Sequence, residues 1–236
     1  MDDLPEITLL TPTYKRHKFL PLWLNNIKNQ SYPHEKIKVI LDECRSNEPF
    51  IDDIEAVRKF LHPIKIDYRV HNSRSTIGMK RNRLVKNCKT KYFQFMDTDD
   101  LYEPNCCLYN YCLLKEKNVK CVGSDKMLFC YTKDNYKVCG IDCGNRISLI
   151  HEATIFAERK WFNTSNKFLK KSTGEGKRLF EGMSEKQVAI SQIENVMLCL
   201  VHSDNTIDKD RFKVEDGKMK YPDEKVIEYL KELKIT

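Results

Sequence analysis

Short apolar runs alternate with helical patterns through the first half of this chain, and this alternation constrains its fold more than any other feature. The apolar runs have the length and composition of buried strands and lie at residues 7–11, 37–41, 66–70 and 92–96. Helical patterns separate them, at residues 20–29, 48–61 and 78–88. Strands that alternate with helices of about a dozen residues form βαβ units, so we expect an α/β fold with a mostly parallel, mixed central sheet flanked by helices.

The second half of the chain is less regular, and its expected elements are shorter. They are a helix over 105–118, one strand or two over 119–131, a short strand at 153–157, a mobile loop at 170–184 and an amphipathic helix over 222–234. Residues 188–200 are apolar at both helix and strand spacing, so the pattern leaves their structure open. Because no internal repeat or low-complexity linker interrupts the chain, we expect residues 1–236 to form a single domain.

The composition is that of an ordinary globular protein, with 41% apolar and 32% charged residues. The formal net charge of +7 suits a phosphate-rich ligand, nucleic acid or an anionic membrane surface, and a solvated lysine-rich surface explains it as well. No apolar run reaches the length of about 18 residues that a membrane-spanning helix needs. Charge alone therefore selects no partner.

Ten cysteines are spread along the chain without a CxxC pair. Cys139 and Cys143 are four positions apart, which is not the usual spacing of zinc ligands. The acidic start, MDDLPEITLL, lacks the basic and apolar stretches of a secretory signal. We therefore expect reduced, half-buried thiols and a cytoplasmic protein without a transmembrane segment.

Polar residues follow three of the apolar runs at the point where each run ends. They are Thr11-Pro12-Thr13, Asp42-Glu43 and Asp97-Thr98-Asp99-Asp100. In open α/β sheets, ligands bind beyond the carboxyl ends of the strands. We expect these three clusters to lie at one edge of the sheet and to form the functional site.

The acidic cluster at residues 97–100 carries the strongest chemical signal. Its three carboxylates repel one another unless a cation neutralises them. Alternate residues of an extended segment point the same way, so Asp97 and Asp99 can face one cation together. Oxygen ligands suit Mg²⁺ or Mn²⁺, and these ions complete their shells with substrate phosphates and water. The alternative is an acidic turn that caps a helix beginning near Pro104.

The order of these segments resembles the GT-A-fold glycosyltransferases, specifically the large inverting group called family 2. The first strand of that family ends in a stretch similar to Thr11-Pro12-Thr13-Tyr14-Lys15-Arg16, and its second strand ends with an acidic residue at the position of Asp42. Its G-x-x-x-A-R-N motif is similar to Gly78-Met79-Lys80-Arg81-Asn82, which has one spacer fewer and no alanine. Its DxD motif matches Asp97-Thr98-Asp99.

The resemblance is good over residues 6–105 and weaker beyond. It implies a GT-A, Rossmann-like fold with a nucleotide-binding half at 1–105 and an acceptor-side half at 106–236. It also implies that the nucleotide-sugar donor contacts Thr11, Pro12, Thr13, Tyr14, Arg16, Asp42, Gly78, Lys80, Arg81, Asn82, Asp97 and Thr98. Many GT-A enzymes bring a late histidine to the metal, so the expected ligands of Mn²⁺ or Mg²⁺ are Asp97, Asp99 and His202.

The catalytic base of the family often follows a glycine in a G-E-D stretch. Gly174-Glu175-Gly176 is the nearest match in this chain, and it lacks the aspartate. Glu175 is therefore the sequence-based candidate for the base. Glu181, Glu152, Asp204 and Asp142 are the alternatives.

The expected function is that of a metal-dependent, inverting glycosyltransferase without a nucleic-acid partner. It would move a sugar from a nucleotide diphosphate, with UDP favoured because it is the commonest donor nucleotide in the family, to a hydroxyl of a glycan, protein or lipid. One alternative is a sugar-nucleotide nucleotidyltransferase, which usually has a glycine-rich loop where this chain reads TPTYKRHKF. The other is a non-catalytic carbohydrate- or nucleic-acid-binding module, which would not need three clustered carboxylates.

Overall fold

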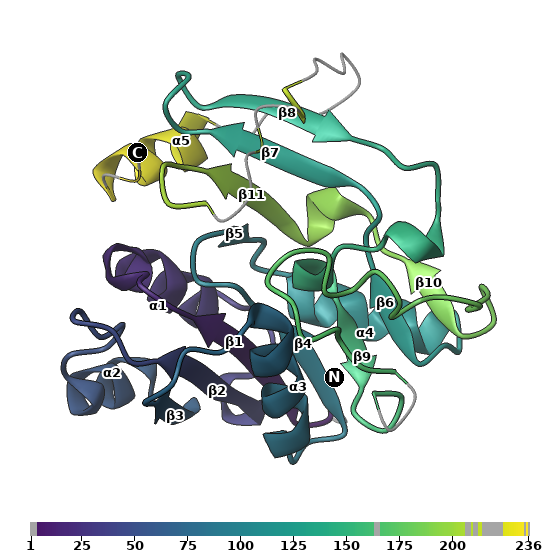
Figure 1. Cartoon of the computed structure of the whole chain (residues 1–236), viewed down its shortest axis with the longest axis horizontal. Helices are drawn as coiled ribbons and strands as arrows, with labels where there is room; N and C mark the ends of the chain where they lie inside the picture. Colours follow the sequence, from purple (N-terminus) through teal and green to yellow (C-terminus); the bar gives the residue numbers. More distant parts are fainter. Residues whose placement is uncertain are drawn as a thin grey trace.

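The computed structural model describes residues 4–162, 166–205, 209, 212–213, 224–233 and 235. Within them, a seven-stranded sheet has the order β10 (Val188–Ile190), β6 (Cys121–Gly123), β9 (Phe156–Glu158), β4 (Tyr92–Phe95), β1 (Ile7–Thr13), β2 (Ile37–Cys44) and β3 (Lys65–His71). A four-stranded sheet has the order β5 (Leu101–Tyr102), β11 (Met197–Val201), β7 (Met127–Tyr131) and β8 (Lys137–Ile141). The helices are α1 (Leu20–Lys28), α2 (Ile54–Leu61), α3 (Ile77–Asn87), α4 (Cys106–Glu116) and α5 (Glu224–Glu232). Figure 1 shows the smaller sheet as a second layer beside the larger one.

The larger sheet is mixed but mostly parallel. Strand β1 pairs in parallel with β2 and β4, β2 pairs in parallel with β3, and β10 pairs in parallel with β6. Only β9 runs against its neighbours β4 and β6. The expected α/β fold with a mostly parallel central sheet is therefore confirmed, and strands from the second half of the chain extend the sheet that the first half begins.

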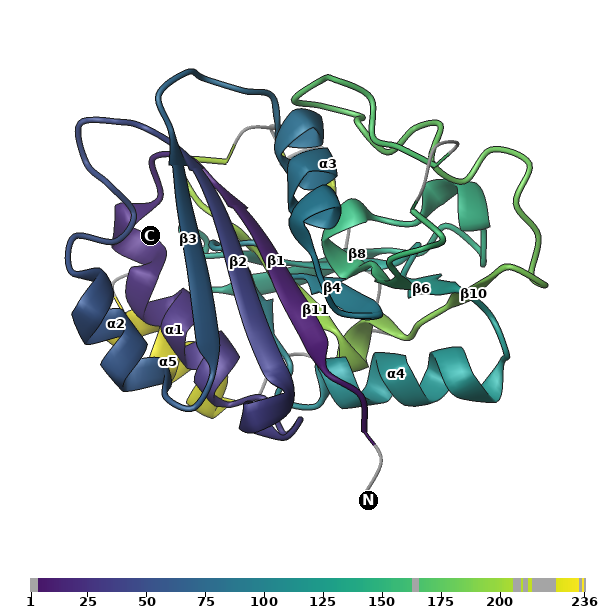
Figure 2. The same cartoon turned by 90° about the horizontal axis from the view of Figure 1, so that it is seen from below.

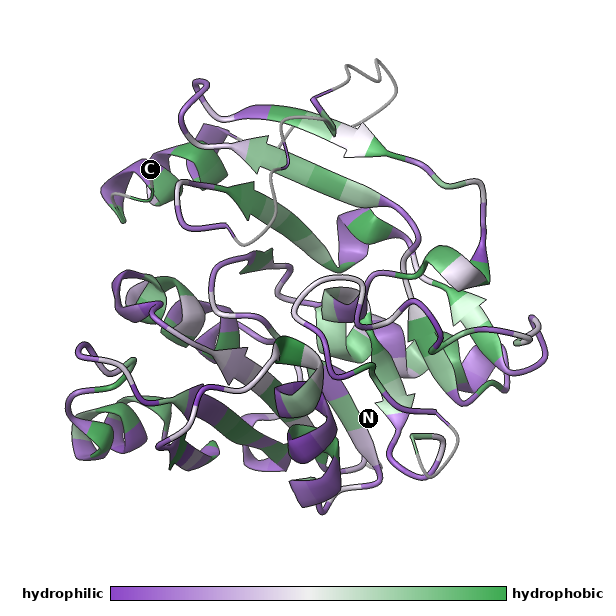
Figure 3. Cartoon of the chain, in the orientation of Figure 1, coloured by the Kyte–Doolittle hydropathy of each residue, from purple (hydrophilic) through white to green (hydrophobic). Residues whose placement is uncertain are grey.

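Alternate side chains of the central strands enter two different cores. Leu9 and Leu41 belong to a large core with α1, α2, α4 and the smaller sheet. Leu10 and Ile40 belong to a second core with Leu84 of α3. Since successive residues of a strand face opposite sides, this division places helices on both faces of the sheet, as Figure 2 shows. In Figure 3 the central strands are green at their apolar residues, with paler or purple segments where polar residues interrupt them.

The start of the second helix differs from the sequence prediction. Residues 48–53 lie outside α2, and Asp53 is its N-cap, accepting hydrogen bonds from the backbone N–H groups of Glu55 and Ala56 at 3.0 Å. The N–H of Phe50, the residue after Pro49, donates instead to the Glu43 carboxylate. The helix begins at residue 54 because an aspartate cap satisfies its first donors, whereas an early proline only removes one of them.

Three segments of the second half were predicted incorrectly, left undecided or not predicted at all. The strand expected at 153–157 begins later, as β9 at Phe156, after a 3-10 turn over Glu152–Thr154. The undecided segment 188–200 forms β10 and β11, separated by a 3-10 turn at Ile193–Asn195. Strand β8 was not predicted from sequence, and it is held by antiparallel pairing with β7.

All ten cysteines are free thiols, and eight of them are buried. Across the part of the chain that the structure describes, no helix has the length and apolar character needed to cross a membrane.

Candidate active site

The carboxyl ends of β1, β2 and β4 meet at one edge of the larger sheet. Pro12 of β1 is in register with Asp42 of β2, and Leu10 with Phe95, the last residue of β4. The acidic turn at residues 97–100 follows β4 after one residue, Met96. The Thr11 hydroxyl donates to the Met96 carbonyl at 2.8 Å and ties the end of β1 to the start of that turn. The three polar clusters of the sequence are thereby brought to the same edge.

Each carboxylate of the acidic turn has a different partner. Asp97 Oδ2 lies 2.8 Å from an Arg81 guanidinium nitrogen, and its Oδ1 is buried without a hydrogen-bond partner. Asp99 Oδ2 lies 2.8 Å from Arg16 Nε. Asp100 turns toward β11, where its Oδ1 accepts the Leu200 N–H at 3.1 Å. Asp97 and Asp99 are therefore paired with two arginines, and Asp100 is a structural link.

The carboxyl groups of Asp97 and Asp100 differ from that of Asp99 in the direction of their pKa shifts. Burial raises the pKa of Asp97, although the charge of Arg81 opposes the shift. Burial likewise raises the pKa of Asp100 to about 7. Burial would also raise the pKa of Asp99, but the hydrogen bond from His202 and the charge of Arg16 outweigh it and hold that pKa well below its usual range. Asp99 is thus the most firmly ionised carboxylate of the turn.

His202 reaches the acidic turn from the end of β11. Its side chain is completely buried, its ring lies 4.5 Å from that of Phe19, and its Nε2 lies 3.3 Å from Asp99 Oδ2. The backbone N–H of Asp204 donates to His202 Nδ1 at 3.1 Å, which leaves Nε2 facing Asp99. If Nε2 bound a cation, Nδ1 would carry the ring proton, and the 202–205 turn would have to release the Asp204 N–H.

Helix α3 presents its first residues to the same edge. The Thr76 hydroxyl caps the helix by accepting the Met79 N–H at 3.3 Å. The buried ammonium of Lys80 donates to the Thr13 carbonyl, and burial lowers its pKa. The Asn82 amide both donates to the Phe168 carbonyl at 2.9 Å and accepts the Phe168 N–H at 3.0 Å. The Asn82 amide therefore helps to fix the 166–176 segment on α3.

Gly78 lies where that segment packs most closely on α3. A Cβ at residue 78 would lie 1.9 Å from the Leu169 carbonyl oxygen, a backbone atom that cannot move aside on its own. We expect Gly78→Ala to lower the free energy of unfolding by about 1–3 kcal/mol, as overpacking does, and to make residues 166–176 more susceptible to proteolysis. Urea unfolding and limited proteolysis measure both effects. The control is Lys86→Ala at an exposed position of the same helix, which should change stability by less than about 0.5 kcal/mol.

Arg81 is the centre of a buried charged cluster. Its guanidinium is 4.8 Å from the centroid of the Phe95 ring and 5.9 Å from that of Phe168, so two aromatic rings lie within cation–π distance of it. Its Nε lies 3.5 Å from Glu175 Oε1, in addition to the Asp97 contact. Glu175 is only 6% exposed, and burial raises its pKa. The sequence-based candidate for the base is therefore a buried partner of Arg81.

Asp42 and Tyr14, which the sequence predicts to contact the donor, both have basic neighbours. Asp42 is buried and accepts two hydrogen bonds from Arg83, at 2.7 and 2.9 Å. The half-buried ring of Tyr14 has the guanidinium of Arg74 at 5.0 Å and the ammonium of Lys80 at 5.5 Å from its centroid. Arg74 and Arg83 were missed from the sequence. Arg83 could have been found because it follows Lys80 by three positions and therefore shares its side of the helix.

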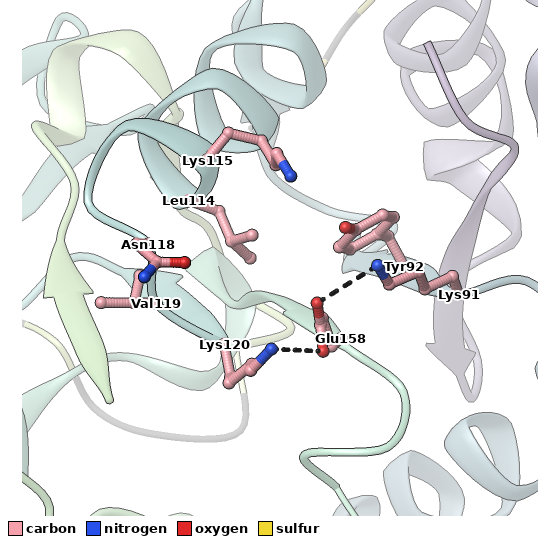
Figure 4. A pocket seen from close by; sticks show the side chains of 8 residues that line it. All are labelled: Lys91, Tyr92, Leu114, Lys115, Asn118, Val119, Lys120 and Glu158. Atoms are coloured by element: carbon pink, nitrogen blue, oxygen red, sulfur yellow. Dashed lines mark ion pairs between the residues drawn. The ribbon is translucent and has the colours of Figure 1, made fainter. Parts of the chain in front are cut away.

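A small cavity lies at the opposite end of the sheet, as Figure 4 shows. It has a volume of about 120 Å³ and is lined by Lys91 and Tyr92 at the start of β4 and by Lys120 before β6. Glu158 bridges Lys91 and Lys120 at 3.6 and 3.3 Å. Because ligands of such sheets bind at the carboxyl ends of the strands, this cavity is not a candidate for the donor site.

The model of one protein family, described as Glycosyl transferase family 2, matches residues 8–147. The chain belongs to that family. Among curated relatives, the putative teichuronic acid biosynthesis glycosyltransferase TuaG of Bacillus subtilis is 25% identical over 99 residues, which are 42% of this chain and 38% of the relative. The poly(ribitol-phosphate) beta-N-acetylglucosaminyltransferase TarS of Staphylococcus aureus is 27% identical over 96 residues, 40% of this chain and 16% of the relative. The chain thus spans well under half the length of these relatives.

Solved structures of other glycosyltransferases share the fold. Staphylococcus aureus TarS 1–349 in complex with UDP-GlcNAc has a TM-score of 0.68 and 14% identity, over 88% of this chain and 63% of that one. The mannosyltransferase PcManGT from Pyrobaculum calidifontis, in complex with GDP-Man and Mn²⁺, has a TM-score of 0.59 and 16% identity, over 80% of this chain and 57% of that one. The GT-A fold expected for this family 2 chain is therefore confirmed.

Proposed function

We propose that this chain is a metal-dependent, inverting glycosyltransferase domain that transfers a sugar from a nucleotide diphosphate, UDP by preference, to an acceptor hydroxyl. The observation that carries the proposal is the meeting of Asp97 and Asp99 with Arg16 and Arg81 at the carboxyl ends of the strands. Two carboxylates can hold a divalent cation there, and two guanidinium groups can accept a diphosphate. Relatives of the same fold in complexes with UDP-GlcNAc and with GDP-Man and Mn²⁺ support it.

The residues at the acidic turn fit Mn²⁺ or Mg²⁺. In the described residues, no group of three or more His, Cys, Asp or Glu is preassembled as a metal site. Asp97 nevertheless has a buried carboxylate oxygen without a hydrogen-bond partner. Asp99, two positions later in the sequence, has a lowered pKa and is therefore ionised. These two carboxylates would hold the cation, with His202 joining if its turn rearranges. When bound, the cation offsets the negative charge that develops on the diphosphate leaving group.

The chain's own residues would bind the donor and remove the proton from the acceptor. Arg16 and Arg81, which neutralise the aspartates here, would turn to the donor phosphates as the cation replaces them. Tyr14 offers an aromatic face to the base, and Asp42 offers a hydrogen-bond acceptor to the base or ribose. A carboxylate of the site, with Glu175 as the candidate from sequence, removes the proton of the acceptor hydroxyl. That hydroxyl attacks the anomeric carbon from the face opposite the nucleotide, which inverts its configuration.

Tyr14→Ala is expected to weaken UDP binding about 5- to 30-fold. The loss follows from one stacking contact of about 1–2 kcal/mol between the ring and the base. Calorimetric titration with UDP and Mn²⁺ measures it. Phe60→Ala is the control, because Phe60 is a 51% exposed aromatic residue on α2 and should leave UDP affinity unchanged. Equal affinity of the Tyr14 variant and the wild type would refute this placement of the base.

Thermal denaturation with nucleotides tests the proposal as a whole. A ligand that binds only the native state raises the melting temperature, and UDP should do so more strongly with Mn²⁺ present than with EDTA. A nucleotidyltransferase would instead respond to nucleoside triphosphates and sugar phosphates. A binding module would respond to oligosaccharides or nucleic acid without nucleotide diphosphates.

A further inference from the structure

Glu152 lies at a fixed place beside the cluster around Arg81. Glu152 is the first residue of the 3-10 turn before β9, and hydrogen bonds fix the backbone on both sides of it. The N–H of His151 donates to the Ser124 carbonyl at 2.9 Å, and the N–H of Thr154 donates to the His151 carbonyl at 3.0 Å. The turn places the Glu152 carboxylate against the 174–176 loop. The position of the carboxylate is therefore set by the backbone of the turn as well as by the side-chain rotamer.

Gly176 provides the space that the Glu152 carboxylate occupies. Its N–H donates to Glu152 Oε1 at 2.9 Å. A Cβ at residue 176 would lie 2.3 Å from that oxygen and 2.7 Å from Glu152 Cγ. The carboxylate thus fills the place where a side chain at position 176 would begin. Position 176 is also where the G-E-D pattern has the aspartate that this chain lacks.

The other carboxylates of the site are already engaged. Arg81 pairs with both Asp97 and Glu175, and Arg16 pairs with Asp99. Glu175 is buried, whereas Glu152 is partly exposed. Over the described ranges of the chain, no hydrogen bond or ion pair involves Glu152 Oε2. Glu152 therefore has an oriented carboxylate with one oxygen free to meet a substrate.

Hydrogen bonds also tie the Glu152 turn to the acidic turn. The Tyr102 hydroxyl accepts the Asp97 N–H at 2.9 Å and donates to the carbonyl of Ala153, the residue after Glu152, at 3.2 Å. One hydroxyl group thus joins the two turns. Glu152 therefore lies near the acidic turn, where the donor is proposed to bind and an acceptor hydroxyl must approach.

We propose that Glu152 is the catalytic base and that Glu175 is a positioning residue that holds Arg81. In the step, the acceptor oxygen forms a bond to the anomeric carbon and gives its proton to Glu152 Oε2. The bond from the anomeric carbon to the diphosphate oxygen breaks, and its electron pair leaves with the nucleoside diphosphate. The assignment rests on the glycosyltransferase function proposed above.

The test compares Glu152→Gln, Glu175→Gln and Glu181→Gln, the last at an exposed position of the same loop region. Release of UDP from UDP-GlcNAc and UDP-glucose, with water as acceptor, measures turnover, and calorimetry measures UDP affinity with Mn²⁺. Glu152→Gln should lower turnover by about 10²–10⁴ and change UDP affinity less than about twofold, as expected for the loss of a base. Glu175→Gln should have the smaller effect on turnover, and Glu181→Gln should match the wild type.

Two further variants examine the contact itself. Gly176→Ala places a methyl group against the carboxylate and should lower turnover while UDP affinity is kept. Glu152→Ala should regain part of its turnover with added formate, a small carboxylate that fits the vacated space. Normal turnover of Glu152→Gln, or a severe loss confined to Glu175→Gln, would overturn the assignment while leaving the glycosyltransferase function intact. A wild-type protein that neither binds UDP nor releases it would overturn that function as well.

Discussion

Asp99→Ala is expected to abolish the Mn²⁺-dependent part of UDP binding and to reduce turnover by at least about a thousandfold. The reason is the ionisation of Asp99, which Arg16 and His202 maintain despite burial. A metal ligand must be deprotonated, and no other carboxylate of the turn is held ionised so firmly. Calorimetric titration with UDP, in Mn²⁺ and in EDTA, separates the metal-dependent affinity from the rest.

The matched control for this variant is Asp204→Ala. Asp204 is close to the same residues, and its backbone carbonyl accepts a hydrogen bond from Arg16 at 2.7 Å. Its carboxylate, however, is 46% exposed and pairs with Lys18 at 2.7 Å, so its removal should leave the Mn²⁺ dependence unchanged. Tight, Mn²⁺-dependent UDP binding by Asp99→Ala would show that the cation is held elsewhere.

Arg81→Met should destabilise the fold by about 3–5 kcal/mol, the largest effect on stability that we expect from a single substitution. Arg81 is 2% exposed and is the partner of two carboxylates, the buried Glu175 and the partly exposed Asp97. Breaking a buried ion pair from one side leaves charge without compensation in a poorly solvated place. Urea unfolding at neutral pH measures the change in the free energy of unfolding.

Two further variants, measured by the same urea unfolding, serve as controls. Arg58→Met removes an exposed arginine that pairs with Glu55 three positions earlier on α2, and it should cost less than about 1 kcal/mol. Adding Asp97→Asn and Glu175→Gln to Arg81→Met removes the uncompensated charges and should restore much of the stability. If Arg81→Met unfolds at the same urea concentration as the wild type, the cluster is not energetically coupled in this way.

The central strands of the first half were predictable from sequence because β1, β2 and β4 are buried on both faces. Every residue of β1 and β4 is buried, as is every residue of β2 except Lys38, and the helices between these strands carry their own periodicity. The second half depends on pairing between distant segments. Strand β10 has three residues and β11 five, and neither is long enough for a pattern to distinguish it from a helix.

The candidate site likewise combines residues that sequence motifs indicate with contacts that they do not. The sequence suggests Asp97, Asp99 and His202 as metal ligands, and this stays a prediction. The structure places Asp99 beside His202, because β11 pairs with β5, which follows Asp99. The pairing of Asp42 with Arg83 spans 41 positions, and the contact of Glu152 with Gly176 spans 24. These contacts follow from how α3 and the 166–176 segment pack, which no local pattern in the sequence specifies.

The most direct test of the central claim is the release of free nucleotide from a panel of sugar nucleotides by the purified protein. Uridine, guanosine and other nucleotide diphosphate sugars are each incubated with the wild type, in Mn²⁺ and in EDTA. We predict release of nucleoside diphosphate from at least one uridine diphosphate sugar, dependent on Mn²⁺ and lost in Asp99→Ala. Absence of release from every member of the panel, together with no nucleotide-induced rise in melting temperature, would contradict the assignment of this chain as an active glycosyltransferase.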